Sequence, residues 1–413
     1  MKKYFIDLFA GAGGLAEGFV ASGFLPLAHV EMNKEACNSL ITRLGYHYLK
    51  SKNKLEIYYK YLKKEISREE FLAHIDKKVI SSVINETISD ETIDKIFSTI
   101  DNNIKNQKAS VEVIIGGPPC QAYSIVGRSV QGERVSKDKR NWLFKLYLRF
   151  LDRYKPSVFV FENVTGLLSA AGGKYYIELF DGLQKAGYHV ESRTLTSSDY
   201  GVIQNIRRVI ILGIKNGMPI KDIYPLPNKI ANKYFVNDLF SDLPSLTNTN
   251  SCFQYAGPIT KYCLKTGIRT EDDVLTWHTK RINNERDREI YKTAIRIWNE
   301  KQSRLNYNSL PKQLKTHKNT KAFVDRFKVV AGNLHCSQTI LAHLAKDGHY
   351  FIHPDIKQCR SISVREAARL QSFPDSYYFE GSRGAAFTQI GNAVPPLLSK
   401  AIAERIMSYF KEI

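Results

Sequence analysis

Cys120 and Glu162 are the residues of this sequence whose types and positions are best suited to chemistry. Cys120 follows the apolar, mostly β-branched run 111–115, which predicts a buried strand, and a turn stiffened by the prolines 118–119. Glu162 stands at the carboxyl end of a second apolar run, 158–161. If the two strands are parallel neighbours, the thiol and the carboxylate form a nucleophile and an acid in one pocket. The alternative is a tight turn with a small buried thiol.

A glycine-rich turn near the start of the chain is suited to binding a cofactor. The range 4–8 predicts a strand, and the turn FAGAGG (9–14) leads from it into a helical pattern. A second predicted strand, 25–30, ends in Glu31, which follows the first glycine of the turn by about 20 residues, the spacing at which an acid takes ribose hydroxyls. Because the turn is not GxGxxG, the cofactor is either a dinucleotide or a mononucleoside such as S-adenosylmethionine. A turn that binds nothing remains the alternative.

The composition favours a polyanionic partner. Lys and Arg number 60 against 41 Asp and Glu, a formal charge of +19, which favours nucleic acid over a membrane, with a merely soluble basic surface as the alternative. The six cysteines lie far apart without a CxxC pair, as in a reducing cytosol. Four histidines near Cys336 lack the tight spacing of a zinc site, so no metal site is predicted. No apolar run approaches the roughly 18 residues of a membrane span.

The pattern of apolar residues divides the chain into parts. Apolar residues at helical spacing over 45–110 predict a helical insertion between strands, whose lysines form a solvated face or, in the minority alternative, a partner-binding one. The α/β pattern stops near residue 215, and 216–358 is irregular, with basic residues among aromatic ones, as suits a surface that follows phosphates. The α/β character returns over 359–413. We therefore predict an α/β protein with a first domain over 1–215, a second over 216–358, and a C-terminal segment that rejoins the first.

The segment after Cys120 is rich in glycine and basic residues, among them Arg128 and Arg140. Beside a nucleophile, such a segment is typical of a mobile lid that closes on phosphates. An ordinary surface loop is the alternative.

Six motifs occur in a fixed order along the chain. They are DLFAGAGGL (7–15), GGPPCQAYS (116–124), ENV (162–164), QNIRR (204–208), REAARLQSFPD (365–375) and QIGNAVPP (389–396). In these motifs and their order the sequence resembles the DNA (cytosine-5)-methyltransferases of bacterial restriction-modification systems. The resemblance implies a Rossmann-like, S-adenosylmethionine-dependent methyltransferase core with a helical insertion and a second, smaller and irregular target-recognition domain over 216–358.

The resemblance also implies roles for single residues. Cys120 would be the nucleophile, Glu162 the acid at the base and Arg208 the contact to the cytosine carbonyl. The implied S-adenosylmethionine contacts are Phe9, Gly11, Gly13, Glu31, Met32, Pro119, Leu143, Asn392 and Val394. The implied DNA contacts are Ser124, Arg128, Arg140, Gln204 and Arg207.

Two positions depart from the family pattern. The family usually has an Asp-Ile pair ahead of the cysteine strand, in contact with the adenine amine, and in the corresponding range 85–88 this chain offers Glu86 as the only acid. The family's QxRxR reads Gln204 to Arg208 here, with Ile206 in place of the first arginine and Arg207 as its possible substitute.

The implied activity is site-specific methyl transfer to C5 of a cytosine flipped out of duplex DNA, through a covalent bond from Cys120 to C6. We expect a cytoplasmic, nucleoid-associated bacterial monomer, with double-stranded DNA as its partner, a cognate restriction endonuclease acting separately, and no membrane. Three rivals remain: a tRNA cytosine-5 methyltransferase, a catalytically silent nucleic-acid-binding homologue, and a nicotinamide oxidoreductase. The GAGG turn and the PPC turn weaken the last of these.

Overall fold

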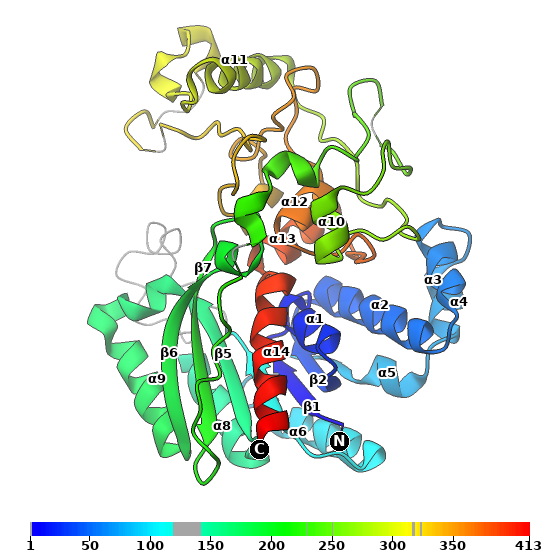
Figure 1. The fold of residues 1–413 in the computed structure, drawn as a ribbon, viewed down its shortest axis with the longest axis vertical. Coiled ribbons are helices and arrows are strands. Elements are labelled where there is room, and N and C mark those ends of the chain that lie inside the picture. Colours follow the sequence, from blue (N-terminus) through cyan, green and yellow to red (C-terminus); the bar gives the residue numbers. More distant parts are fainter. Residues whose placement is uncertain (1, 119–141, 229, 250, 316–318, 323) are drawn as a thin grey trace.

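The computed structural model describes residues 2–118, 142–228, 230–249, 251–315, 319–322 and 324–413. Five residues of the predicted site lie outside the described residues: Pro119, Cys120, Ser124, Arg128 and Arg140. The chain folds into a seven-stranded sheet covered by helices and a second, largely irregular region that lies beyond one edge of the sheet (Figure 1). The α/β fold class predicted above is confirmed.

The strand order explains why the predicted chemistry gathers at one edge. In order across the sheet the strands are β3 (Val83–Asn85), β2 (Leu25–Glu31), β1 (Tyr4–Leu8), β4 (Val113–Gly116), β5 (Val158–Val164), β7 (Arg207–Lys215) and β6 (Tyr188–Thr196). Neighbours from β3 to β5 are parallel, whereas β7 is antiparallel to both β5 and β6. The amino end of β7 therefore meets the carboxyl ends of β1 to β5. The chain direction across the sheet reverses between β1 and β4, and ligands bind at such a switch point in open α/β sheets.

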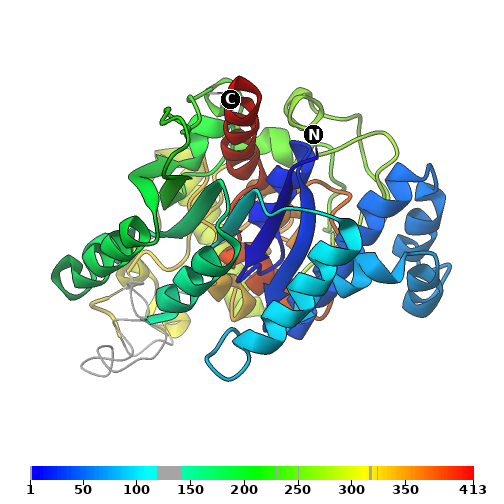
Figure 2. The same cartoon turned by 90° about the horizontal axis from the view of Figure 1, so that it is seen from below.

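Helices cover both faces of the sheet, because its central strands are apolar on both sides. On one face lie α6 (Ile93–Gln107), α8 (Leu143–Tyr154) and α9 (Lys174–Lys185), which share a core with β1, β2, β4 and β5. On the other lie α1 (Gly14–Ala21) and α14 (Pro396–Glu412). Figure 2 shows α14 and α6 on opposite sides of the strands. Short 3-10 helices follow β5 and β6, namely η3 (Thr165–Leu168), η4 (Ala170–Gly173) and η5 (Ser197–Tyr200).

Helices α1 and α14 touch through their backbones. A side chain on Gly18 would overlap the backbone of Ser399 and Lys400, so only glycine permits the approach. The Ser399 hydroxyl donates to the carbonyl of Leu15, which closes the contact. Residues near the two ends of the described chain therefore form one layer over the sheet.

The predicted insertion over 45–110 proves to be only partly separate from the sheet. It contains the end of α2 (Lys34–Ser51) and the helices α3 (Leu55–Leu62), α4 (Arg68–Ala73) and α5 (Lys77–Ser81). It also contains β3 and α6, which extend and cover the sheet itself. With three residues, β3 is too short to show the alternation by which a strand is recognised in a sequence.

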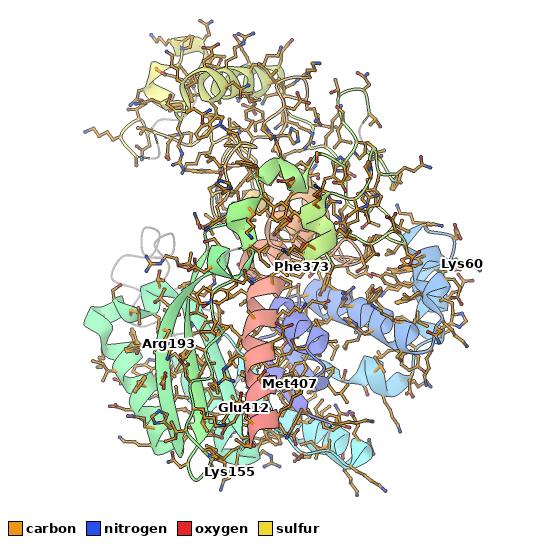
Figure 3. The ribbon with its side chains drawn as sticks, in the orientation of Figure 1. Lys60, Lys155, Arg193, Phe373, Met407 and Glu412 are labelled. Atoms are coloured by element: carbon orange, nitrogen blue, oxygen red, sulfur yellow. The ribbon has the colours of Figure 1, made fainter. Side chains whose placement is uncertain are left out.

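The second region is built mainly from short elements. Its elements are η6 (Ile230–Lys233), η7 (Val236–Leu239), α10 (Lys261–Thr266), α11 (Glu285–Lys301), η8 (Tyr307–Ser309), η9 (Lys312–Leu314), η10 (Ala342–Ala345), α12 (Val364–Leu370) and α13 (Arg383–Asn392). Helix α11 has a core of its own at the far end of the molecule in Figure 1. Helices α12 and α13 pack with η7 and α10, so within 359–413 it is α14 that lies on the sheet. Figure 3 shows Phe373 at this junction and Met407 on α14.

A buried charged cluster holds α12 in the second region. The guanidinium of Arg369 donates to Asp375 at 2.6 Å and to Asp242 at 2.5 Å, and no more than 1% of any of these side chains is exposed. Burial is the largest influence on the pKa of Asp375 and raises it. The charges of Arg369 and Arg365, with the hydrogen bonds from Arg369 and Tyr255, together outweigh burial and hold that pKa below its ordinary value. Residues 242 and 375 are thereby joined through one arginine.

Candidate active site

The turn after β1 has an unusual backbone. Phe9, Gly11 and Gly13 have φ values of 55°, 54° and 72°, in the left-handed region that is costly for a residue with a side chain such as Phe9. Among the described residues, no heavy atom lies within 4 Å of the place where a side chain on Gly11 would begin. Strained backbone of this kind gathers at ligand sites, where the rest of the fold holds it in place.

Glu31, at the end of β2, is tied directly to this turn. One carboxylate oxygen accepts a hydrogen bond from the Gly11 N–H at 2.8 Å, and the other accepts one from the Asn33 N–H at 2.8 Å. Burial raises the pKa of Glu31, and these two N–H groups oppose the rise. Glu31 and Gly11, which the motif spacing predicts to share a site, are therefore in contact. Met32, the next residue in the chain after Glu31, is exposed.

Asn85 lies beside the predicted cofactor residues, although the sequence did not point to it. At the end of β3, its amide donates to the carbonyls of Glu31 at 3.1 Å and Met32 at 3.0 Å. The predicted candidate at this place, Glu86, instead bonds the ammonium of Lys95 at 2.7 Å and the N–H of Thr87 at 3.2 Å. The only feature of the sequence that could have pointed to Asn85 is its place at the end of a strand, and β3 is too short to be recognised in the sequence.

The other predicted cofactor residues lie at or near the same edge. The carbonyl of Val394 packs so closely on Gly14 that a side chain there would overlap it, which holds the segment after α13 against the start of α1. Asn392 is exposed as the last residue of α13, and Leu143 is half-buried as the first residue of α8.

Glu162 and Arg208 form an ion pair across two antiparallel strands. Nε of Arg208 lies 2.7 Å from a carboxylate oxygen of Glu162, and the side chains are 12% and 14% exposed. Register places Arg208 opposite Val164, two residues beyond Glu162. Burial raises the pKa of Glu162, and the charge of Arg208 opposes that rise. The pair combines a carboxyl group suited to holding a proton with a fixed positive charge.

The turn that leads to Cys120 is packed against this pair. A side chain on Gly117 would lie 2.5 Å from a carboxylate oxygen of Glu162. The amide of Asn163 donates to the carbonyl of Pro118 at 3.2 Å. The carboxylate predicted at the end of one strand and the turn predicted at the end of the next are therefore neighbours. Cys120 itself lies two residues past the described segment that ends at Pro118.

Gln204, which the sequence predicts as a DNA contact, lies inside the protein in this structure. The side chain is fully buried: its oxygen accepts from the Ile340 N–H at 2.5 Å, and its amide donates to the Leu370 carbonyl at 3.2 Å and to the side chain of Gln371. Gln204 therefore connects the start of β7 to the second region and has no face left for DNA. Arg207, by contrast, is exposed, and Ile206 is 1% exposed in the core.

Neither a metal site nor a membrane segment is seen in the described part of the chain. No three histidine, cysteine or acidic side chains converge there as metal ligands would. Among the described residues, no helix is both long and apolar enough to cross a membrane.

Comparison with known proteins identifies the family. The model of the family described as C-5 cytosine-specific DNA methylase matches residues 70–408. Type II methyltransferase M.Bpa9945I of Bacillus paralicheniformis is 43% identical, over 97% of this chain and 98% of its own. Type II methyltransferase M.AgeI of Thalassovita gelatinovora is 30% identical, again over 97% of this chain and 98% of its own.

The fold has solved counterparts as well. The crystal structure of a prophage-encoded candidate DNA modification methyltransferase (E. coli) matches with a TM-score of 0.63 at 22% identity, covering 99% of this chain and 100% of the other. At that identity the likeness bears on the fold alone. With the family match and the two relatives, it leads to one conclusion: the chain belongs to the C-5 cytosine-specific DNA methylase family and is a DNA (cytosine-5-)-methyltransferase.

Proposed function

We propose that this enzyme transfers a methyl group from S-adenosylmethionine to C5 of a cytosine flipped out of duplex DNA, through a covalent bond between Cys120 and C6. The observation that carries the proposal is the arrangement at the sheet edge, where the Gly11–Glu31 turn, the Glu162–Arg208 pair and the turn leading to Cys120 follow neighbouring strands.

The residues at the cofactor end suit S-adenosylmethionine. The carboxylate of Glu31 keeps a lone pair on each oxygen for ribose hydroxyls, and the left-handed turn with open space at Gly11 lets a ligand approach the backbone. Exposed Met32 offers an apolar surface to the adenine, and Asn85 is our addition to the set, beside it at the end of β3. When bound, the cofactor supplies an electrophilic methyl group on a sulfonium. Phe9, Gly13, Pro119, Leu143, Asn392 and Val394 complete the proposed contacts.

The chemistry follows from the low reactivity of cytosine at C5. The thiolate of Cys120 adds to C6, a sulfur–carbon bond forms, and electron density moves through the ring toward C5 and N3. C5 then forms a bond to the methyl carbon as the bond from that carbon to the sulfonium breaks. A solvent base then takes the C5 proton. The electron pair of that C–H bond forms the double bond between C5 and C6 as the bond from C6 to Cys120 breaks, and the proton held at N3 returns to Glu162, so the aromatic ring and the thiolate are restored.

Glu162 and Arg208 stabilise the adduct. As density reaches N3, Glu162 donates a proton or a hydrogen bond there, and its raised pKa keeps a larger share of the carboxyl protonated than an ordinary glutamate would have. Arg208 adds a positive charge toward O2 of the base. The ion pair that joins the two side chains orients both toward one base.

DNA binding offsets the cost of flipping the base, which is a few kcal/mol. Arg207, Ser124, Arg128 and Arg140 are proposed to contact the DNA, and Gln204 leaves that set because it is buried. The relatives' designation as type II methyltransferases supports a place in a restriction-modification system, with a cognate endonuclease acting separately. A monomer supplies every proposed group from one chain.

The decisive experiment is to incubate the protein with methyl-labelled S-adenosylmethionine and duplex DNA, with tRNA in parallel, using wild type and Cys120→Ser. We expect label in DNA as 5-methylcytosine, lost in the variant because serine is a far weaker nucleophile at neutral pH. Label in tRNA alone would make the protein a tRNA methyltransferase. Absence of transfer to either substrate would leave a nucleic-acid-binding homologue and overturn the role of Cys120.

Gly117→Ala tests whether the thiol turn must lie against Glu162. The added methyl group would sit 2.5 Å from a carboxylate oxygen and 3.0 Å from the backbone oxygen of Glu162, so one side must move. We expect the methylation rate to fall roughly tenfold to hundredfold, as for a displacement of about 1 Å in an active site. The matched control is Gly384→Ala, whose new methyl group meets only the Ser382 hydroxyl at 3.7 Å. Equal rates in both variants would contradict the packing argument.

A further inference from the structure

Three cations form a stripe on one face of α11. Arg288, Lys292 and Arg296 are exposed and follow one another at four-residue spacing, so they lie within an arc of about 80° and roughly 6 Å apart along the helix. Asn299, one turn further on, falls within the same arc. We call these three cations the α11 stripe.

The α11 stripe is left without ion pairs in the described part of the chain. Among the described residues, none of its three side chains has an ion pair or a hydrogen bond, whereas nearby Arg304 pairs with Asp325 at 3.2 Å. The stripe faces the turn that contains Cys359. Burial raises the pKa of that thiol, and the charge of Asp355 adds to the rise, whereas the charges of Lys292, Arg288 and Arg296 oppose it. An exposed row of unpaired cations beside a turn is suited to holding an anion with repeated charges.

A polar groove lies at the C-terminal half of α11. It has a volume of about 480 Å³ and runs between α11, η7 and the segments 332–333 and 353–360. The amides of Asn237 on η7 and Asn299 on α11 line it, and neither has a hydrogen-bond partner among the described residues. The groove therefore presents two free amide groups, each of which can donate and accept.

The rim of this groove is fixed. Nε1 of Trp298 donates to the side-chain oxygen of Asn333 at 3.1 Å, and the amide of Asn333 donates to Gln302 at 3.0 Å. On its inner side α11 is held by Ile290, Ala294 and their neighbours in a separate apolar core. The amide of Asn299 is thus carried by a helix that these contacts hold in place.

The acidic groups that line the groove are already occupied. The carboxylate of Glu366 is bonded by Arg360 at 2.6 Å and 2.7 Å, and that of Asp355 accepts from the Lys357 N–H at 2.9 Å and the Gln358 amide at 3.1 Å. The charge of Glu366 is therefore offset by Arg360, and the oxygens of Asp355 are taken up by neutral N–H donors of its own turn.

We propose that α11 is the element that reads the DNA target: the α11 stripe contacts phosphates of the backbone, and the amides of Asn237 and Asn299 hydrogen-bond the edge of an adenine in the recognition site. Asparagine amides match the donor and acceptor that adenine presents in the major groove, and unpaired lysine and arginine side chains hold phosphates. This inference rests on the proposed function, because it takes duplex DNA as the substrate. In Figure 1, α11 lies beyond the sheet edge at which β7 begins.

The phosphate contacts are tested by measuring the affinity for duplex DNA against salt concentration. The variant Arg288→Gln/Lys292→Gln/Arg296→Gln removes the α11 stripe, and the control Lys60→Gln/Lys63→Gln/Lys64→Gln removes three exposed charges around α3. Lys60 is labelled in Figure 3, away from α11. We expect the stripe variant to flatten the plot of log affinity against log salt by close to three units, with about 0.9 per phosphate contact, and to weaken binding to all sequences alike. Equal slopes in the stripe variant and the control would overturn the phosphate contacts.

The base contact is tested by the double variant Asn237→Ala/Asn299→Ala. After sequencing has located the methylated sites of the wild type, each base pair of the site is changed in turn and the methylation rates are compared. We expect the variant to lose discrimination by about tenfold to hundredfold at one A·T position and to keep it at the others. Unchanged discrimination at every position would overturn the reading role.

The two proposals fail in different ways. A wild type that binds duplex DNA without transferring a methyl group would refute the proposed function, and the salt dependence of its binding would still support or overturn the α11 stripe. Active methylation with equal salt slopes in the stripe variant and the control would refute the inference alone. A wild type that binds no duplex DNA would overturn both.

Discussion

Glu162→Gln lowers the rate of methyl transfer by about 10²-fold to 10⁴-fold, the usual contribution of a general acid. Glutamine keeps the size of the side chain and can still donate a hydrogen bond to N3. It cannot transfer a proton to N3 when electron density moves into the cytosine ring. The carboxyl group is suited to that task because burial raises its pKa, while Arg208 at 2.7 Å orients it. The measurement is kcat with methyl-labelled cofactor and a duplex that contains the site.

The pH dependence sharpens this test. Because the acid works in its protonated form, the part of kcat/KM that depends on Glu162 decreases as pH rises through the raised pKa of Glu162. In the Glu162→Gln variant this decrease is absent from the plot of kcat/KM against pH. Glu191→Gln is the matched control, because Glu191 also pairs with an arginine of the sheet, Arg193 at 3.0 Å, but is 39% exposed and on the outer strand β6. A Glu162→Gln rate within tenfold of the wild type, or equal losses in both variants, would exclude the acid role.

Arg369→Met destabilises the fold by about 3–5 kcal/mol, the cost of removing one partner from a buried ion pair. The variant leaves two buried carboxylates short of positive charge, with no more than 1% of either side chain exposed. Asp242 keeps only Arg269 at 2.6 Å, and Asp375 keeps only Arg365 at 3.6 Å as a cationic partner. The measurement is the free energy of unfolding in urea. Arg369→Met/Asp375→Asn recovers part of the loss, because the second change removes one of the two buried negative charges.

Exposure and pH provide the controls for this prediction. Arg153→Met breaks a pair with Asp101 whose side chains are 45% and 40% exposed, and it costs no more than about 1 kcal/mol of folding free energy.

Because the folded-state pKa of Asp375 is lowered, the stability that Asp375 contributes is present above about pH 4 and is lost as pH falls below that value. Arg369→Met loses less stability over that acidic range than the wild type. An equal cost for Arg369→Met and Arg153→Met would contradict the argument.

The sequence predicts this site best where neighbouring strands bring motifs together. Gly11 and Glu31 follow β1 and β2, and the structure joins them by a hydrogen bond of 2.8 Å. The turn before Cys120 and the carboxylate of Glu162 follow β4 and β5, and Gly117 lies directly against that carboxylate. Parallel strands carry their carboxyl ends to one edge, so strand recognition is enough to predict which residues converge.

The sequence predicts poorly where the partners come from distant segments. Gln204 has the polar side chain of a DNA contact, yet its partners are Ile340, Leu370 and Gln371, which pattern alone cannot place beside it. Asn85 was missed because a strand of three residues is too short to show the alternation of apolar and polar side chains by which strands are recognised. Helix α12 shows its capping box, with Ser363 and Glu366, in the sequence, but the side on which it packs depends on a core drawn from the second region.

The contact of Gly18 with Ser399 and Lys400 sets an order of events during synthesis. Helix α1 leaves the ribosome early, but the face of the sheet that it shares with α14 stays uncovered until residues 396–412 have been added. An apolar face left open during translation is a surface for chaperones and a site of aggregation. A chain released before residue 396 therefore lacks the helix that covers α1 and this face of the sheet, and the core is closed only once α14 has been translated.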